Sequence, residues 1–110
     1  MTGPRPTIST HILDTGTGAP AAGVPVRLWR SEPPGSAELL SELRTDADGR
    51  IRDLLAGARL IAGRYRLEFG LDDGGFFTGL SVDVAIDDPE RSYHVPLLRA
   101  PFGLSTYRGS

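Results

Sequence analysis

Short stretches with an apolar residue at every second position, separated by turn-forming residues, limit what this chain can fold into. Alternation of this kind is typical of β-strands that bury one face. It predicts seven or eight strands, and the pattern covers residues 7–13, 24–29, 38–45, 64–69, 82–86, 93–98 and 105–108. Turn signals recur about every eight to twelve residues, and no long segment has a helical period. We therefore expect an all-β fold, an antiparallel β-sandwich.

The alternation also predicts which side of a strand is buried. In the first strand, Ser9 and His11 lie on the face opposite the apolar residues. Pro25, which has no N–H to donate to a neighbouring strand, indicates an edge position or the start of a strand. A short helix over residues 54–61, or after Phe69, is compatible with the pattern. The residues expected to point inward are Ile8, Thr10 and Ile12, then Val24, Val26 and Leu28, then Tyr65, Leu67 and Phe69.

Length and composition predict one domain that packing alone holds together. The 110 residues suffice for a single core, which we place at residues 7–110 after a flexible leader, 1–6. The absence of cysteine excludes disulfides and thiolate chemistry. The leader lacks the apolar core of a signal peptide, and no stretch approaches the roughly 20 apolar residues of a membrane span. We therefore expect a cytoplasmic protein.

The charge pattern argues against two classes of partner. The chain has 12 basic residues, all arginine, against 14 acidic ones, which gives a net charge of -2. Because the arginines form no cluster, the chain lacks the charge that neutralises phosphate groups. We expect no nucleic-acid partner and no membrane partner.

Common catalytic and metal-binding motifs are missing. The segments 79–83 and 103–107 both lack the last glycine of a nucleophile elbow. The run Thr-Asp-Ala-Asp-Gly at 45–49 lacks the further ligands of a calcium loop, so a hairpin turn explains it better. A zinc site normally needs three or four protein ligands, and the chain has only two histidines. We predict no metal and no cofactor.

Three residues remain as candidates for chemistry. His11 and His94 can take up and release a proton near neutral pH. Arg50, which follows the Asp-Gly turn, can donate paired hydrogen bonds to an oxyanion or a planar polar group. Each of these residues alone is more often structural, so only several occurring together would indicate a site.

The C-terminal run supplies such a combination. Tyr-His-Val-Pro at 93–96 and Ser-Thr-Tyr-Arg-Gly-Ser at 105–110 resemble the signature of the transthyretin-like proteins that act as 5-hydroxyisourate hydrolases, whose chains close on Tyr-Arg-Gly-Ser. The resemblance extends to residues 9–30, 44–51 and 63–69, and so covers nearly the whole chain. The central segments also resemble β-sandwich modules of adhesins and carboxypeptidase accessory domains.

The resemblance implies a fold, an assembly and a reaction. It implies a homotetramer, a dimer of dimers of eight-stranded sandwiches, with active sites in the cleft between dimers. The implied substrate is 5-hydroxyisourate, a small planar product of purine oxidation. Water would open its ring amide to give 2-oxo-4-hydroxy-4-carboxy-5-ureidoimidazoline in urate catabolism, without a metal. The implied catalytic residues are His11, Arg50, His94 and Ser110, and the implied substrate-binding residues are Tyr107, Arg108 and Gly109.

The implied roles leave one choice open. Either His11 or His94 would activate the water, and Arg50 would hold the oxyanion or the substrate. Ser110, through its hydroxyl or terminal carboxylate, would orient a histidine or the water, while Tyr107 and Arg108 shape the pocket. An Arg50 close to the base is expected to lower the pKa of that base.

Two departures from the family pattern are visible near the C-terminus. Ser92 stands where the family often has a histidine, and Phe102–Leu104 stand where a tyrosine is frequent, so the rim of the cleft would change.

Two other functions stay open. One alternative is a small-molecule carrier of the transthyretin type, in which apolar residues would replace the histidines and arginine. The other is a structural β-sandwich module without catalysis, which the missing signal peptide and anchor disfavour.

Overall fold

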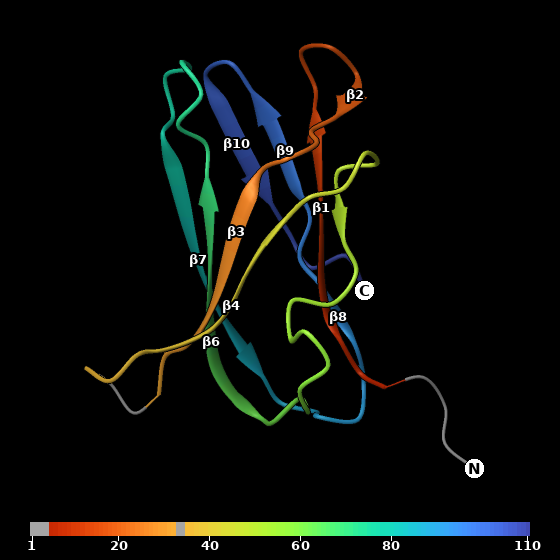
Figure 1. Cartoon of the computed structure of the whole chain (residues 1–110), viewed down its shortest axis with the longest axis vertical. Helices are drawn as coiled ribbons and strands as arrows, with labels where there is room; N and C mark the ends of the chain where they lie inside the picture. The colour runs from red at the N-terminus through yellow and green to blue at the C-terminus, as the bar shows by residue number, and fades with distance from the viewer. Residues whose placement is uncertain (1–4, 33–34) are drawn as a thin grey trace.

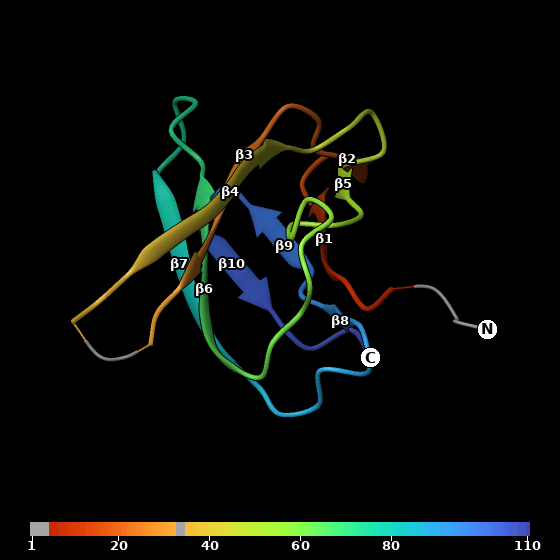
Figure 2. The same cartoon turned by 60° about the horizontal axis from the view of Figure 1, so that its bottom comes forward.

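The protein folds as two β-sheets that form separate layers (Figures 1 and 2). This computed structural model describes residues 5–32 and 35–110, which contain ten strands and no helix. The first sheet has the order β10 (Gly103–Thr106), β9 (Leu97–Ala100), β1 (Ile8–Asp14) and β2 (Ala19–Pro20), and β5 (Arg50–Ile51) and β8 (Tyr93–His94) also pair with β1. The second sheet has the order β4 (Glu38–Arg44), β3 (Pro25–Arg30), β6 (Gly63–Gly70) and β7 (Gly79–Ile86). The predicted all-β sandwich is confirmed.

The inward faces of the two sheets form the core, and the alternation predicts them correctly. Strands β1 and β6 alternate buried and more exposed residues along most of their length. Thr10 is a polar residue on the buried face. Its hydroxyl donates a hydrogen bond to the carbonyl of Val95 at 2.6 Å, so the buried hydroxyl has a partner. Pro25 is the first residue of β3, and the start of a strand was one of the two positions predicted for this proline. The predicted inward residues are all buried: Ile8, Thr10, Ile12, Val24, Val26, Leu28, Tyr65, Leu67 and Phe69.

The main differences from the predicted strands lie in the C-terminal region and in two very short strands. The expected strand 93–98 is divided into β8 and β9, because Pro96 has no N–H with which to continue the ladder. The last strand covers residues 103–106 rather than 105–108, so Tyr107 and Arg108 lie beyond it. The two-residue strands β2 and β5 are too short to produce an alternation pattern, and the sequence analysis did not find them.

Two of the strand pairings are parallel, in a sandwich that is otherwise antiparallel. Strand β1 runs parallel to β8, with Ser9 opposite His94, and parallel to β9, with Ile12 opposite Leu97. The remaining pairings of both sheets are antiparallel. The parallel pairings bring the first strand of the described chain against its C-terminal region.

The segment 54–61 folds without a helix. The carboxylate of Asp53 accepts hydrogen bonds from the N–H groups of Leu55 and Gly57, and such local bonds favour turns over helices. Ala56 and Gly57 then take positive φ angles of 52° and 89°, which end any right-handed turn. Within the described residues, no helix has the length and apolarity needed to cross a membrane. The buried side chains of this segment are Leu54, Leu55 and Leu60.

Part of the predicted leader and loop lies outside the described residues. Positions 1–4 of the leader 1–6, and positions 33–34 of the β3–β4 connection, are not described. Arg5, which is described, donates a hydrogen bond to the carbonyl of Gly57. The boundary between a leader and a domain at residue 7 therefore stays a prediction.

Gly49 allows β5 to approach β1 closely, and we expect its replacement to destabilise the fold. Its φ is +75°, and a Cβ there would lie 2.5 Å from the carbonyl oxygen of Ile12. Gly18 has a similar φ of +77°, but a Cβ at that position would meet no atom within 4 Å, so Gly18→Ala is the matched control. We expect Gly49→Ala to lower the free energy of unfolding by about 1–3 kcal/mol more than the control does. Urea denaturation measures both, and equal losses would show that the approach to Ile12 is unimportant.

Candidate active site

A short strand places Arg50 directly beside His11. Strand β5 pairs antiparallel with β1, and His11 and Arg50 are opposite each other in the register. The carboxylate of Asp46 stabilises the turn that leads into this strand. Its Oδ1 accepts hydrogen bonds from the N–H of Asp48 at 2.8 Å and from the N–H of Arg50 at 3.0 Å. The pKa of Asp46 is lowered, chiefly by the hydrogen bond from Arg50 N–H. The predicted Asp-Gly turn thus sets the backbone position of Arg50.

His94 reaches the same face of the sheet through β8. Its neighbour across the parallel pairing is Ser9, and the Ser9 Oγ lies 2.8 Å from His94 Nδ1. Ser9 and His11 are two positions apart on β1, so they share a face at a spacing of about 6.5 Å. Residues from the first strand, the central turn and the C-terminal region therefore meet on one surface: Ser9, His11, Arg50 and His94.

The surroundings of His94 favour its neutral form. Burial lowers the pKa of His94, and the nearby charge of Arg50 and the proximity of His11 lower it further. A hydrogen bond to the backbone of Ser9 acts in the opposite direction and does not reverse the shift. The direction is the one expected of a base with Arg50 close to it. A neutral imidazole can accept a proton, so the environment favours the form of His94 that is chemically able to act as a base.

A polar hollow of about 290 Å³ opens beside Arg50 and His94, and His11 is not among the residues that line it. Its lining combines a hydroxyl, an imidazole and two guanidinium groups, which can hydrogen-bond a small polar molecule from several sides. Arg52, the second arginine of this lining, was not among the predicted site residues. The lining residues are Ser9, Thr10, Arg50, Ile51, Arg52 and His94.

The C-terminal residues pack directly against His94. The N–H of Gly109 donates to the carbonyl of His94 at 2.8 Å. A Cβ on Gly109 would lie 2.5 Å from His94 Cδ2, so only glycine fits against the ring without displacement. Ser110 follows this contact and is exposed. Figures 1 and 2 show the C-terminal end beside β8 and β1.

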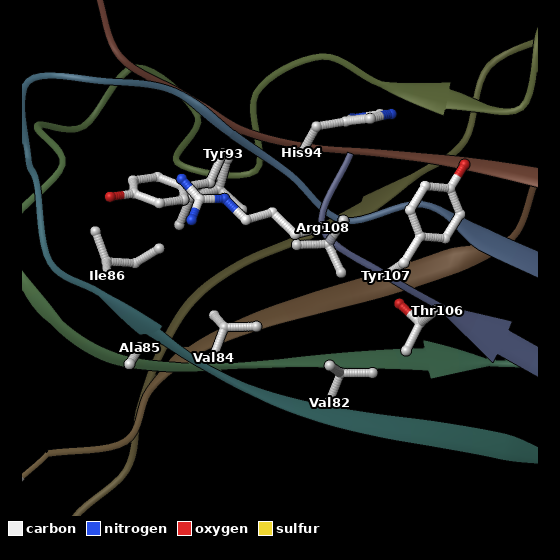
Figure 3. Close-up of a pocket in the computed structure, with 11 residues that line it drawn as sticks. Val82, Val84, Ala85, Ile86, Tyr93, His94, Thr106, Tyr107 and Arg108 are labelled. Carbon is white, nitrogen blue, oxygen red and sulfur yellow. The ribbon is translucent and has the colours of Figure 1, made fainter. Parts of the chain in front are cut away.

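Tyr107 and Arg108 line a second, more apolar hollow rather than the polar one. This hollow has a volume of about 250 Å³. Figure 3 shows the side chain of Arg108 extending toward Tyr93 within it. The Arg108 guanidinium carbon lies 5.0 Å from the centre of the Tyr93 ring, in a cation–π contact. His94 lines both hollows and is the residue that connects them. The apolar wall opposite is formed by Val82, Val84, Ala85 and Ile86.

The two departures from the family pattern lie away from the polar hollow. The Ser92 hydroxyl oxygen accepts a hydrogen bond from the N–H of Thr7 at 2.9 Å, so it ties the start of β1 to the segment before β8. Phe102 is 82% exposed in the β9–β10 turn, where its ring centre lies 6.1 Å from that of Phe76. Neither side chain lines the hollow that contains Arg50 and His94.

Ser9, like Arg52, lines the site and was not among the predicted site residues. The alternation of β1 places it on the same face as His11, which is the signal that was available. Its contact with His94 depends on a pairing between residues 85 positions apart, which no local pattern reveals. Within the described residues, no group of three or more histidine, cysteine, aspartate or glutamate side chains is arranged to hold a metal ion.

The fold and this face together define a class of protein, the transthyretin-like β-sandwiches with histidines and an arginine on the outer face of one sheet. The chain belongs to the HIUase/Transthyretin family, whose model matches residues 8–109. A 5-hydroxyisourate hydrolase of Caulobacter vibrioides is 47% identical to it over 114 residues, which span 94% of this chain and 97% of that protein.

Solved structures show the same likeness. The 5-hydroxyisourate hydrolase of Klebsiella pneumoniae matches with a TM-score of 0.81 and 42% identity, over 96% of this chain and 94% of that one. Sea bream transthyretin, in complex with thyroxine, matches with a TM-score of 0.81 and 28% identity, over 92% of each chain. The predicted family is confirmed, and the predicted enzyme class, a hydrolase, agrees with the names of the more similar relatives.

Proposed function

We propose that this protein is a 5-hydroxyisourate hydrolase that acts in urate catabolism. The observation that carries the proposal is the meeting of His11, Arg50 and His94 on one face of the first sheet. Family membership and the names of the relatives support it independently. The product would be 2-oxo-4-hydroxy-4-carboxy-5-ureidoimidazoline.

The chemistry requires a base, an oxyanion partner and a proton for the leaving nitrogen. A histidine accepts a proton from water while the water oxygen attacks the ring carbonyl carbon. Arg50 donates hydrogen bonds to the oxygen that becomes negative, and its charge is permanent at any working pH. The same histidine then returns the proton to the ring nitrogen as the carbon–nitrogen bond breaks. No metal and no cofactor takes part in the proposed step.

The C-terminal residues complete the proposed site. The contact of Gly109 with His94 supports a role for this segment in fixing the ring. Ser110, one residue further, would orient the water or a histidine through its hydroxyl or carboxylate. Tyr107 and Arg108 would form the side of the pocket next to Tyr93, where the second hollow lies.

The carrier alternative fits the lining of the polar hollow poorly. A site for an aromatic hormone would require mainly apolar walls, whereas Arg50, Arg52 and His94 present charge and hydrogen-bond donors here. The identity to sea bream transthyretin, 28%, is also lower than the 42% to the Klebsiella hydrolase. A purely structural module leaves the gathering of these side chains without a reason. The homotetramer, as a dimer of dimers, and the cytoplasmic location stay predictions.

Stopped-flow absorbance on freshly generated 5-hydroxyisourate tests the proposal. We expect the wild-type protein to accelerate decay of the substrate in proportion to enzyme concentration, in buffer that contains EDTA, because the mechanism needs no metal. Thyroxine binding, measured by calorimetry, should be absent or weak. A folded wild-type protein that leaves the spontaneous decay rate unchanged would contradict the hydrolase proposal, and tight thyroxine binding would then favour the carrier.

The lowered pKa of His94 predicts how activity depends on pH. In the unfolded chain the imidazole has the ordinary pKa of 6.5, and in the folded protein burial, Arg50 and His11 lower it. The neutral, active form therefore persists as the pH falls from 8 through 6.5, and it is lost only when the pH falls through the lower folded pKa. The profile of kcat/KM between pH 5 and 8 measures this. An acid limb with its midpoint at or above 6.5 would contradict the prediction.

A further inference from the structure

The hydrogen bond between Ser9 and His94 has a consequence for which ring nitrogen carries the proton. The two side chains are half-buried, and the 2.8 Å contact joins Ser9 Oγ to Nδ1 specifically. A neutral imidazole has one N–H and one free lone pair, and only the nitrogen with the lone pair can act as a base. A proton on Nδ1 leaves Nε2 free to accept another from water.

The Ser9 hydroxyl is the group that meets this edge of the ring, at Nδ1 and not at Nε2. A hydroxyl oxygen can donate or accept a hydrogen bond, so it is able to accept the Nδ1 proton. The carbonyl of Ser9 accepts the N–H of Val95 at 2.9 Å, which fixes the backbone of Ser9 beside the ring. With Nδ1 occupied by Ser9, Nε2 is the nitrogen left open to water.

The opposite edge of the ring is held by the C-terminal segment. Gly109 packs so closely that a Cβ there would lie 2.5 Å from Cδ2 and 3.2 Å from Cγ. The Nδ1 edge thus faces Ser9 and the Cδ2 edge faces Gly109. The ring is fixed between a strand and the tail, which leaves Nε2 and Cε1 as its free edge.

The charged groups around the ring favour the neutral state on which this tautomer depends. From β1, His11 faces His94, and from β5, Arg50 does so, while Arg52 lines the same hollow. From the tail, Arg108 lines the second hollow that His94 also borders. None of these four groups is a carboxylate that would stabilise a positively charged imidazole. The carboxylate to be set against them in the proposed site is that of Ser110, one residue beyond the Gly109 contact.

We propose that Ser9 is a positioning residue that keeps His94 in the tautomer with the proton on Nδ1, so that Nε2 of His94 is the base that activates water. The inference rests on the proposed hydrolase function and decides between the two histidines. In the reaction, Nε2 takes one proton from water as the water oxygen bonds to the ring carbonyl carbon. The imidazolium returns that proton to the ring nitrogen when the carbon–nitrogen bond breaks, so one water is added and His94 ends neutral.

NMR of the two imidazole rings tests the tautomer without any substrate. The chain has only His11 and His94, so a ¹H–¹⁵N long-range spectrum of uniformly labelled protein at pH 8 contains two sets of ring signals. The set that disappears in His94→Asn belongs to His94. We expect a protonated Nδ1 and an unprotonated Nε2 in the wild type, and a mixture of tautomers in Ser9→Ala. A wild-type His94 with its proton on Nε2 would overturn the proposal.

The kinetics of three serine variants provide a second test of the role of Ser9. Ser9→Ala should lower kcat about tenfold, with a smaller change in KM, which corresponds to the net worth of one hydrogen bond. Ser9→Thr keeps the hydroxyl on the same strand face and should restore both the tautomer and most of kcat. Ser36→Ala, at an exposed position in the β3–β4 connection, should match the wild type.

The possible outcomes distinguish a failure of the role of Ser9 from a failure of the hydrolase function. A wild-type kcat in Ser9→Ala, or a Ser9→Thr variant that is folded and as slow as Ser9→Ala, would overturn the role of Ser9 and leave the hydrolase in place. A wild-type protein that does not open 5-hydroxyisourate would overturn the proposed function, while the NMR spectrum would still show which nitrogen Ser9 holds protonated.

Discussion

His94→Asn is expected to lower kcat for the opening of 5-hydroxyisourate by about 10²- to 10⁴-fold, the usual worth of a general base. An amide does not accept a proton near neutral pH, so the step in which water is deprotonated loses its acceptor. Asparagine keeps a polar atom close to the place of Nδ1, so the hydrogen bond to Ser9 can be retained. Stopped-flow absorbance measures kcat, and urea denaturation shows whether the variant is folded.

The same experiment with His11→Asn distinguishes the two histidines. If His94 is the base, His11→Asn should reduce kcat less, because His11 then contributes beside Arg50 rather than by proton transfer. A folded His94→Asn variant with nearly wild-type kcat, together with a strongly impaired His11→Asn variant, would reverse the assignment.

Arg50→Gln is expected to lower kcat/KM by about 10²- to 10³-fold, as the loss of one oxyanion donor does in other hydrolases. Glutamine can donate a hydrogen bond but carries no charge to stabilise the developing negative oxygen. The loss of that charge should also raise the pKa of His94, because Arg50 is one of the groups that lower it. The acid limb of the kcat/KM profile should therefore move to higher pH.

Arg64→Gln is the matched control for Arg50→Gln. Arg64 lies on β6 in the second sheet, and its side chain is 71% exposed in an ion pair of 3.4 Å with Glu32. Exposed pairs of this kind contribute about 0–1 kcal/mol, so this variant should keep wild-type activity and stability. Similar kcat/KM values in the two folded variants would remove Arg50 from the proposed mechanism.

The features that could be predicted from the sequence are those that depend on local alternation. Tyr65, Leu67 and Phe69 occupy every second position of a strand long enough to show its period, so the buried face of β6 was correctly expected. The Asp-Gly turn before Arg50 could also be predicted, because turn-forming residues such as Asp46 and Gly49 act within a few positions of each other.

The remaining features depend on hydrogen bonds and strand pairings that alternation does not reveal. Leu54 and Leu60 are buried as helix residues would be, but hydrogen bonds to Asp53 and two positive φ angles turn the chain there instead. The parallel pairing of β1 with β8 leaves no local pattern, so the contact of Ser9 with His94 could not be foreseen. The resemblance to a known family identified His11, Arg50 and His94 as candidates, and the structure shows which strands bring them together.

The pairing of β1 with β8 and β9 also governs when the site can form during folding. It joins Ser9 to His94 and Thr10 to Val95, each pair 85 residues apart in the chain. Closing so long a loop costs entropy before any contact is made, and β-proteins rich in such contacts fold in milliseconds to seconds rather than microseconds. We therefore expect a refolding chain to form its hairpins before the first sheet closes, so that the face with His11 and His94 is completed late.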